Sequence, residues 1–169
     1  FRNITHNQLW YATDDGTGWS LELIDGPGFD VGATVSGSLA LTTDSAGRPH
    51  VAYRYLSSPY EIRYARRTAS GWLLEHAGLD WSAKYDSEVG ISLDPTDGER
   101  PSIAYTYDSG SYEYPVLATR TGAAAWASDQ FAGTIYELDF TGGLRFDSAG
   151  TAWMSFGTDQ RYVTTWTAA

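Results

Sequence analysis

The chain has 169 residues, of which 42% are apolar and 15% aromatic, so it is long enough to bury a core of its own. Its net charge of −10 argues against a nucleic-acid partner, since sequence-independent binding to phosphates needs a surplus of Lys and Arg. No apolar run approaches the roughly 20 residues of a membrane-spanning helix, and the lack of cysteine excludes disulfides and thiolate metal sites.

Short apolar and aromatic runs, separated by turn-forming residues, predict strands along the whole chain. One complete unit comprises four predicted strands: Ser38–Thr42, Pro49–Tyr55, Glu61–Arg67 and Trp72–His76. Alternation at Val51 and Tyr53 indicates strands with two unlike faces. No segment shows a convincing helical period.

The same pattern recurs about every 52 residues. Three runs match one another: Pro49–Tyr53, Pro101–Tyr105 and Ala152–Phe156. Acidic turns that end in glycine recur with them: Asp44–Gly47, Asp94–Gly98 and Asp147–Gly150. Their composition is that of hairpin turns, although a calcium site at such an aspartate is an alternative. Three tryptophans keep the same period, which predicts that they pack between units: Trp19, Trp72 and Trp126.

Four antiparallel strands in a unit of about 50 residues is the blade of a β-propeller, so we expect an all-β fold with about three blade equivalents. The whole chain is then one propeller segment, with a partial blade over 1–37, blades over 38–89 and 90–142, and a partial blade over 143–169. A β-sandwich is the weaker alternative, because it does not require such a strict period.

Three blades cannot close a ring, because propellers use about four to eight. We therefore expect half of a ring that is six-bladed when completed. A second copy could complete it in a homodimer, or further sequence or a different subunit could do so. Without completion, the strands at Leu9–Asp14 and Gly143–Phe146 would be bare edges that invite aggregation.

A family resemblance supports this architecture. The run from Ser38 to Tyr53, Ser-Leu-Ala-Leu-x-x-Asp-Ser-Ala-Gly-Arg-Pro-His-Val-Ala-Tyr, is followed by Ile62–Arg66 and Gly71–Trp72. Together these segments resemble the blade repeats of bacterial β-propeller proteins. The resemblance covers nearly the whole chain and, with the acidic and loop-rich composition, implies an extracellular or secreted protein.

The stretch Ala12–Trp19 is also similar to the Asp-box turn of sialidase-type propellers, Ser-x-Asp-x-Gly-x-Thr-Trp. Ala12 stands in place of the Ser and Gly18 in place of the Thr, and later copies have Arg67 and Thr121 in place of the Asp. The motif is architectural, so it implies a propeller and no particular activity.

The loops expected at one end of the strands are rich in aromatic and acidic residues, whereas the opposite end has short turns. The candidate ligand-binding residues are Trp81, Tyr85, Asp86, Glu88, Tyr107, Asp108, Tyr112, Tyr136 and Glu137. Aromatic rings stack on the apolar face of a sugar, and carboxylates accept its hydroxyl protons. We therefore expect a non-catalytic carbohydrate-binding module, with a protein partner or a structural scaffold as alternatives.

A glycoside hydrolase or sialidase-like enzyme is the third possibility. Two pairs of carboxylates occupy like positions in successive loops: Asp86 with Glu88, and Glu137 with Asp139. Four arginines cluster in one unit: Arg54, Arg63, Arg66 and Arg67. Because Arg66 and Arg67 point to opposite strand faces, we interpret the cluster as solvated strand charges and expect no catalytic residue.

The three histidines, His6, His50 and His76, do not recur at matched positions. We therefore expect no metal site and no cofactor. His50 aligns with Ser102 and Trp153 in the other copies, which is typical of a strand position without fixed chemistry.

Overall fold

All regular structure in the described part of the chain is β-strand. The computed structural model describes residues 1–3, 5, 7–26, 35–55, 60–79, 88–108, 113–130, 139–157 and 162–165. The strands form four antiparallel sheets, numbered here in chain order, and the predicted all-β class is confirmed. Among the described elements, none is a helix that could cross a membrane.

Within each sheet, strands that follow one another in the chain are neighbours. The first sheet contains β1 (Arg2–Asn3), β2 (Gln8–Asp14) and β3 (Trp19–Asp25). The second contains β4 (Val35–Thr43), β5 (Pro49–Tyr55), β6 (Glu61–Thr68) and β7 (Gly71–Leu79). The third contains β8 (Val89–Asp94), β9 (Arg100–Asp108), β10 (Glu113–Gly122) and β11 (Ala125–Gln130). The fourth contains β12 (Asp139–Phe146), β13 (Ala152–Gly157) and β14 (Tyr162–Thr165).

The strands predicted for the complete unit agree with β4 to β7 to within a few residues at each end. The expectation of a bare edge at Leu9–Asp14 is wrong, because β2 pairs with β1 on one side and β3 on the other. The strand at Gly143–Phe146 belongs to β12, which pairs with β13.

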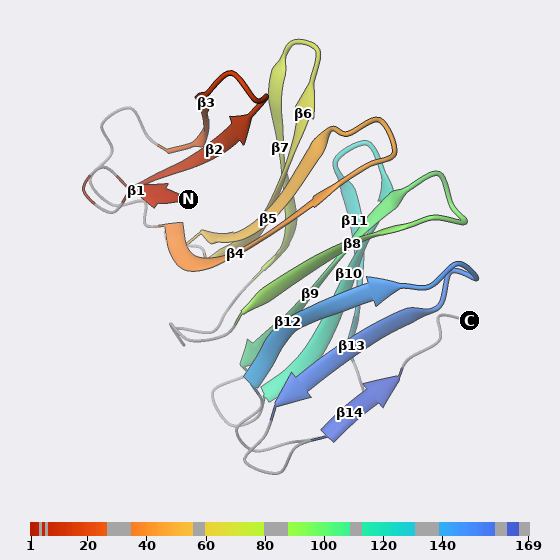
Figure 1. Ribbon diagram of the computed structural model, residues 1–169. Coiled ribbons are helices and arrows are strands. Elements are labelled where there is room, and N and C mark those ends of the chain that lie inside the picture. Colours follow the sequence, from red (N-terminus) through yellow and green to blue (C-terminus); the bar gives the residue numbers. More distant parts are fainter. Residues whose placement is uncertain are drawn as a thin grey trace.

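Successive sheets pack against each other through their faces (Figure 1). Strand β8 contacts both β4 and β12, so the first strands of the second, third and fourth sheets are neighbours. Because inner strands are covered on both faces, all residues of β5 from Pro49 to Arg54 are buried. Alternate side chains of β5 therefore enter different apolar layers: Val51 packs with Leu9 of the first sheet, and Ala52 with Ile103 of the third.

One set of polar and aromatic contacts joins the first sheet to the second. The Trp72 ring meets the Tyr11 ring edge to face, with centroids 5.5 Å apart. The Glu22 carboxylate accepts hydrogen bonds from Arg67 Nε at 2.6 Å and from Trp72 Nε1 at 3.1 Å. We call such a set of four side chains, here Tyr11, Glu22, Arg67 and Trp72, a clamp.

A second clamp joins the second sheet to the third, with each residue 53 or 54 positions further along the chain. The Trp126 ring lies edge to face on Tyr64 at 5.2 Å. The Glu75 carboxylate accepts two hydrogen bonds from Arg120, both at 2.8 Å, and one from Trp126 Nε1 at 3.1 Å. The predicted packing role of Trp72 and Trp126 is confirmed by these contacts.

The packing prediction is wrong for Trp19, whose side chain is 72% exposed. Trp19 pairs with Asp14 across β2 and β3, as Trp72 pairs with Arg67 and Trp126 with Arg120. No sheet among the described residues lies against the outer face of the first sheet, so Trp19 lacks the Tyr and Glu that hold the other two.

Short turns join β4 to β5, β6 to β7, β8 to β9, β10 to β11 and β12 to β13 on one side of the molecule, here called the turn end (Figure 1). The opposite ends of the strands are called the loop end. The predicted acidic turns are confirmed: Asp44 accepts backbone hydrogen bonds from Ala46 and Arg48, and Asp147 accepts them from Ala149 and Thr151. Carboxylates that accept N–H donors in this way stabilise the turn locally.

Candidate functional site

Most of the predicted ligand-binding residues lie outside the described residues: Trp81, Tyr85, Asp86, Tyr112, Tyr136 and Glu137. The other three lie together at the loop end of the third sheet. Glu88 is exposed and precedes β8, and Asp108 ends β9, where it pairs with Glu113. The half-buried Tyr107 ring stacks on Tyr114, with centroids 6.4 Å apart.

The arginines at the loop end are structural, and their interpretation as solvated charges is wrong. Arg54 is only 1% exposed. The Arg63 guanidinium binds Asp25 of the first sheet at 2.8 Å and Glu61 at 3.0 Å, and it lies 3.3 Å from the centroid of the Tyr55 ring. The ion pair between Arg63 and Asp25 joins two sheets, an arrangement that the local sequence does not reveal.

A cavity lies at the other end of the strands, at the turn end between the second and third sheets. It has a volume of about 310 Å³. Its wall consists of Asp44, Arg48, His50, Tyr64, Arg66, Asp97, Gly98, Glu99, Arg100, Pro101, Arg120, Thr121 and Gly122. Four of the chain's ten arginines therefore converge on one pocket of an otherwise acidic protein.

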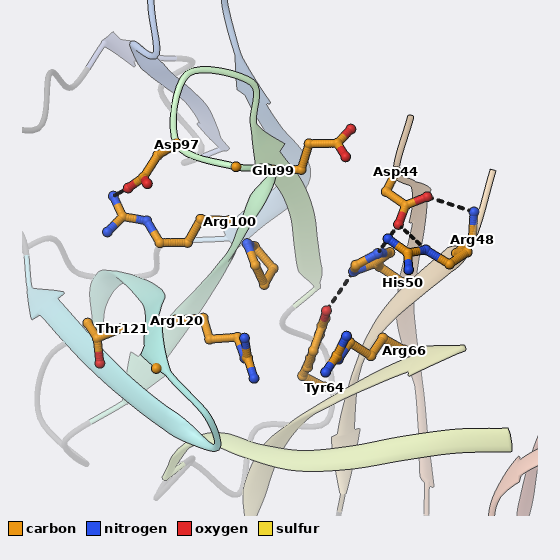
Figure 2. A pocket seen from close by; sticks show the side chains of 13 residues that line it. Asp44, Arg48, His50, Tyr64, Arg66, Asp97, Glu99, Arg100, Arg120 and Thr121 are labelled. Atoms are coloured by element: carbon orange, nitrogen blue, oxygen red, sulfur yellow. Dashed lines mark hydrogen bonds and ion pairs between the residues drawn. The ribbon is translucent and has the colours of Figure 1, made fainter. Parts of the chain in front are cut away.

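A chain of polar contacts forms the wall that the second sheet contributes (Figure 2). His50 Nδ1 lies 2.5 Å from the Tyr64 hydroxyl, and His50 Nε2 lies 3.5 Å from Asp44. Arg48 Nε donates to the same carboxylate at 2.6 Å. A neutral imidazole with its proton on Nε2 satisfies both contacts, because Tyr64 then donates to Nδ1 and Nε2–H faces Asp44.

Electrostatics favour that protonation pattern. Burial raises the pKa of Tyr64, which keeps its hydroxyl protonated. Burial also lowers the pKa of His50 from its ordinary value, although Asp44 opposes this effect. For Asp44, burial is outweighed by hydrogen bonds from the Arg48 backbone and side chain and from His50, and the pKa falls to about 2.

The turn between β8 and β9 forms the opposite rim. The Glu99 carboxylate accepts hydrogen bonds from the Ser45 backbone at 2.6 Å and its hydroxyl at 2.9 Å, which ties this turn to the turn of the second sheet. Glu99 has a φ of 59°, in the left-handed region that is unfavourable for a residue with a side chain. Arg100 pairs with Asp97 at 2.9 Å.

Arg120 belongs to the second clamp, where both of its hydrogen bonds go to Glu75. Its partner Glu75 has a side chain that is only 2% exposed. Burial alone would raise the pKa of Glu75, but the hydrogen bonds and charge of Arg120 lower it below its ordinary value. The Arg120 charge is thus largely neutralised within the protein.

Arg66 differs from the other three arginines of the pocket. It comes from β6, directly opposite His50 in the strand register. Its Nε is buried without a hydrogen-bond partner, as is that of Arg100, but its guanidinium, unlike that of Arg100, forms no ion pair with any described residue. A buried donor left unpaired costs about 1–3 kcal/mol. Figure 2 shows Arg66 and Arg120 extending into the pocket from facing sheets.

The repeat period shows which part of this site is particular to the second sheet. Arg66 aligns with Thr13 and Thr119, each 53 residues away. In the third sheet, the pair equivalent to His50 and Arg66 is Ser102 and Thr119, whose hydroxyls lie 3.0 Å apart. Sequence reasoning missed the pocket, but this break in the repeat was a signal that could have found it.

No protein-family model matches the chain, and no curated protein or solved structure matches it either.

Proposed function

We propose that the protein is a non-catalytic binding module built from β-propeller blades, and that a small polar ligand of the carbohydrate class binds in the turn-end pocket. The observation that carries this proposal is the convergence of arginines, carboxylates, His50 and Tyr64 from two sheets on one cavity of about 310 Å³. That volume is at the lower limit of ordinary ligand pockets and suits a compact molecule. Planar polar side chains around such a space are well placed to hydrogen-bond several hydroxyl groups.

The order of the strands supports the blade assignment. Each of the two four-stranded sheets has its strands in chain order, and β4, β8 and β12 lie next to one another. This is the arrangement expected when successive blades place their first strands around a common axis. Closure of the ring by a second copy stays a prediction. Light scattering tests it, since a dimer has twice the chain mass of 18.5 kDa and a monomer would contradict it.

Binding is favoured over catalysis because the carboxylates of the pocket already have partners. Asp44 holds its turn and Arg48, Asp97 pairs with Arg100, and Glu99 binds Ser45. A glycosidase needs one carboxylic acid to donate a proton and a second carboxylate to act as nucleophile or base. The Tyr64 hydroxyl has a raised pKa and donates to His50, so it is a poor nucleophile.

A second candidate is a neutral sugar or a protein partner at the loop end, as the sequence predicts. The stacked rings of Tyr107 and Tyr114 favour it, because paired aromatic rings are suited to the apolar face of a pyranose. Glu88 is exposed at the same end of the third sheet.

Nuclear magnetic resonance titrations with neutral and acidic monosaccharides separate the two candidates. We expect the amide signals of His50, Tyr64 and Thr121 to shift. Thr121→Trp should block the pocket from its exposed rim and abolish the shifts, whereas Tyr107→Ala should leave them unchanged. Loss of binding in Tyr107→Ala alone would move the site to the loop end, and no shift with any sugar would overturn the carbohydrate proposal.

A further inference from the structure

The geometry points to a carboxylate as the group that the turn-end pocket recognises, and to Arg66 as the residue that binds it. This inference rests on the proposed function and makes it specific: the ligand is a compact organic acid of the size of a sugar acid.

Three of the four arginine charges in the pocket are matched inside the protein. Arg48 pairs with Asp44 at 2.6 Å, Arg100 with Asp97 at 2.9 Å, and Arg120 with the buried Glu75 at 2.8 Å. Only the Arg120–Glu75 pair is buried, with side chains 21% and 2% exposed, so breaking it would leave a poorly solvated charge behind. The Arg48 and Arg100 side chains are 59% and 41% exposed, so water screens their pairs. These three arginines therefore each have an anionic partner within the protein, which Arg66 lacks among the described residues.

Arg66 is the cation that has no such match among the described residues. Its Nε is removed from solvent, and no described group accepts its proton. A guanidinium placed in this way gains more from a bound anion than an exposed one does, because part of its hydration has already been lost. The two Nη atoms form the planar end of the guanidinium, which matches two carboxylate oxygens.

The charge balance favours a carboxylate over a phosphate. With His50 neutral, the three pairs cancel, Arg66 contributes one positive charge, and Glu99 contributes one negative charge at the rim beside Ser45. A phosphate dianion would require more uncompensated cations or a nest of backbone N–H groups. These charges sum to zero, so a monoanion leaves one excess negative charge, whereas a phosphate dianion leaves two.

The repeat supports a role in binding rather than in folding. A threonine occupies the Arg66 position in the first and third sheets, and Ser102 with Thr119 replaces His50 with Arg66 in the third. The cross-strand position therefore does not need an arginine for the strand to form. The second sheet instead carries a cation without an ion-pair partner among the described residues, and a bound anion would supply that partner.

The Nε–H signal of Arg66 provides a direct test, assigned by its absence from Arg66→Lys. Sodium acetate and D-glucuronate are titrated at constant ionic strength, with D-glucose as the neutral match of glucuronate and inorganic phosphate as a tetrahedral anion. We expect saturable shifts of this signal with acetate and glucuronate, and tighter binding of glucuronate than of glucose by about tenfold, the usual gain from a charge-assisted hydrogen bond.

Two variants control the experiment. Arg66→Gln should weaken glucuronate binding by about tenfold, while Arg67→Lys, at the next residue on the opposite face of β6, should leave it unchanged. If Arg66→Gln does not fold, the double variant His50→Ser with Arg66→Thr reproduces the Ser102–Thr119 pair of the third sheet and should fold without binding the acid.

The outcomes separate this inference from the proposed function. Equal binding of glucose and glucuronate, unaffected by Arg66→Gln, would overturn the carboxylate assignment and leave carbohydrate binding in the pocket intact. Tighter binding of phosphate than of acetate, or shifts that grow linearly at all arginines, would also overturn it. If no probe moves any pocket signal, both proposals fail.

Discussion

The junction between the first and second sheets and the junction between the second and third share a clamp and differ in what lies beside it. Both place a tryptophan on a tyrosine of the preceding sheet and join an arginine to a glutamate. Only the second junction has His50 and Arg66 beside the clamp, and that is where the pocket lies. What recurs in the chain holds sheets together, whereas the departure from the repeat marks the candidate site.

The largest expected effect tests the shared part of the junctions. Trp72→Ala removes a ring that packs on Tyr11 and donates to Glu22, and we expect it to lower the free energy of unfolding by about 3 kcal/mol. Trp19→Ala is the matched control, because the Trp19 side chain is 72% exposed, and it should change stability by less than about 0.5 kcal/mol. Urea unfolding followed by circular dichroism measures both. Equal losses would mean that Trp19 is covered in solution.

The sequence predicted the strands and turns that depend only on residues close together in the chain. The alternation at Val51 and Tyr53 located β5, and the acidic Asp44 turn formed as its composition indicated. The exposure of Trp19 could not be predicted, because it depends on which sheet lies outside it. The pairing of Arg63 with Asp25 likewise depends on how the first and second sheets pack.

The candidate site was harder to predict for the same reason. His50 and Arg66 are 16 residues apart and meet only through the register of β5 and β6. Arg120 enters the same cavity from another sheet, 54 residues beyond Arg66. The composition of the loops predicted a site among aromatic residues, whereas charged strand residues next to short turns form the pocket. The signal in the sequence is the arginine at position 66, where the other two repeats have Thr13 and Thr119.

A second pair of variants distinguishes the two clamps. Glu75→Gln removes the buried carboxylate that neutralises Arg120, and we expect it to cost about 2–3 kcal/mol. The released Arg120 adds a second unpaired cation to the pocket, so acetate binding should tighten. In the first clamp, the side chains of Glu22 and Arg67 are 36% and 33% exposed, so Glu22→Gln should cost at most about 1 kcal/mol and leave acetate binding unchanged. Urea unfolding and the acetate titration provide the readouts, and unchanged acetate binding in Glu75→Gln would contradict the role given to its charge.

The tyrosines of the two clamps provide a smaller test. Tyr64→Phe deletes the hydroxyl that donates to His50 and leaves the buried Nδ1 without that donor, so we expect a loss of about 1 kcal/mol. Tyr11 has no described hydrogen-bond partner for its hydroxyl, and Tyr11→Phe should be neutral to within about 0.5 kcal/mol. Thermal unfolding compares them, and equal effects would show that the contact between Tyr64 and His50 contributes little.

The smallest effect is a pH dependence of stability from His50. Four groups set its environment: the Tyr64 hydroxyl, the Asp44 carboxylate, and the charges of Arg48 and Arg66. Burial lowers the folded-state pKa below the ordinary 6.5, so the unfolded chain binds more protons than the folded one in this range. The contribution of neutral His50 to the free energy of unfolding is fully present above about pH 6.5, and it is lost as the pH falls toward the folded-state pKa. Urea midpoints measured between pH 7.5 and pH 5 should therefore decline.

The His50→Ser variant isolates this contribution, because a serine does not titrate and already occupies the equivalent position in the third sheet. Its urea midpoint should decline less over the same range. Asp44 does not contribute to this decline. Its pKa is lowered from 3.8 to about 2, so its stabilising effect is lost only below about pH 3.8, outside the range measured. A bound carboxylate next to His50 would stabilise the imidazolium and raise its pKa, so acetate should bind more tightly at pH 5.5 than at pH 7.5 in the wild type and not in His50→Ser. If acetate binding depends on pH equally in both proteins, a group other than His50 titrates, and His50 has no role in binding the carboxylate.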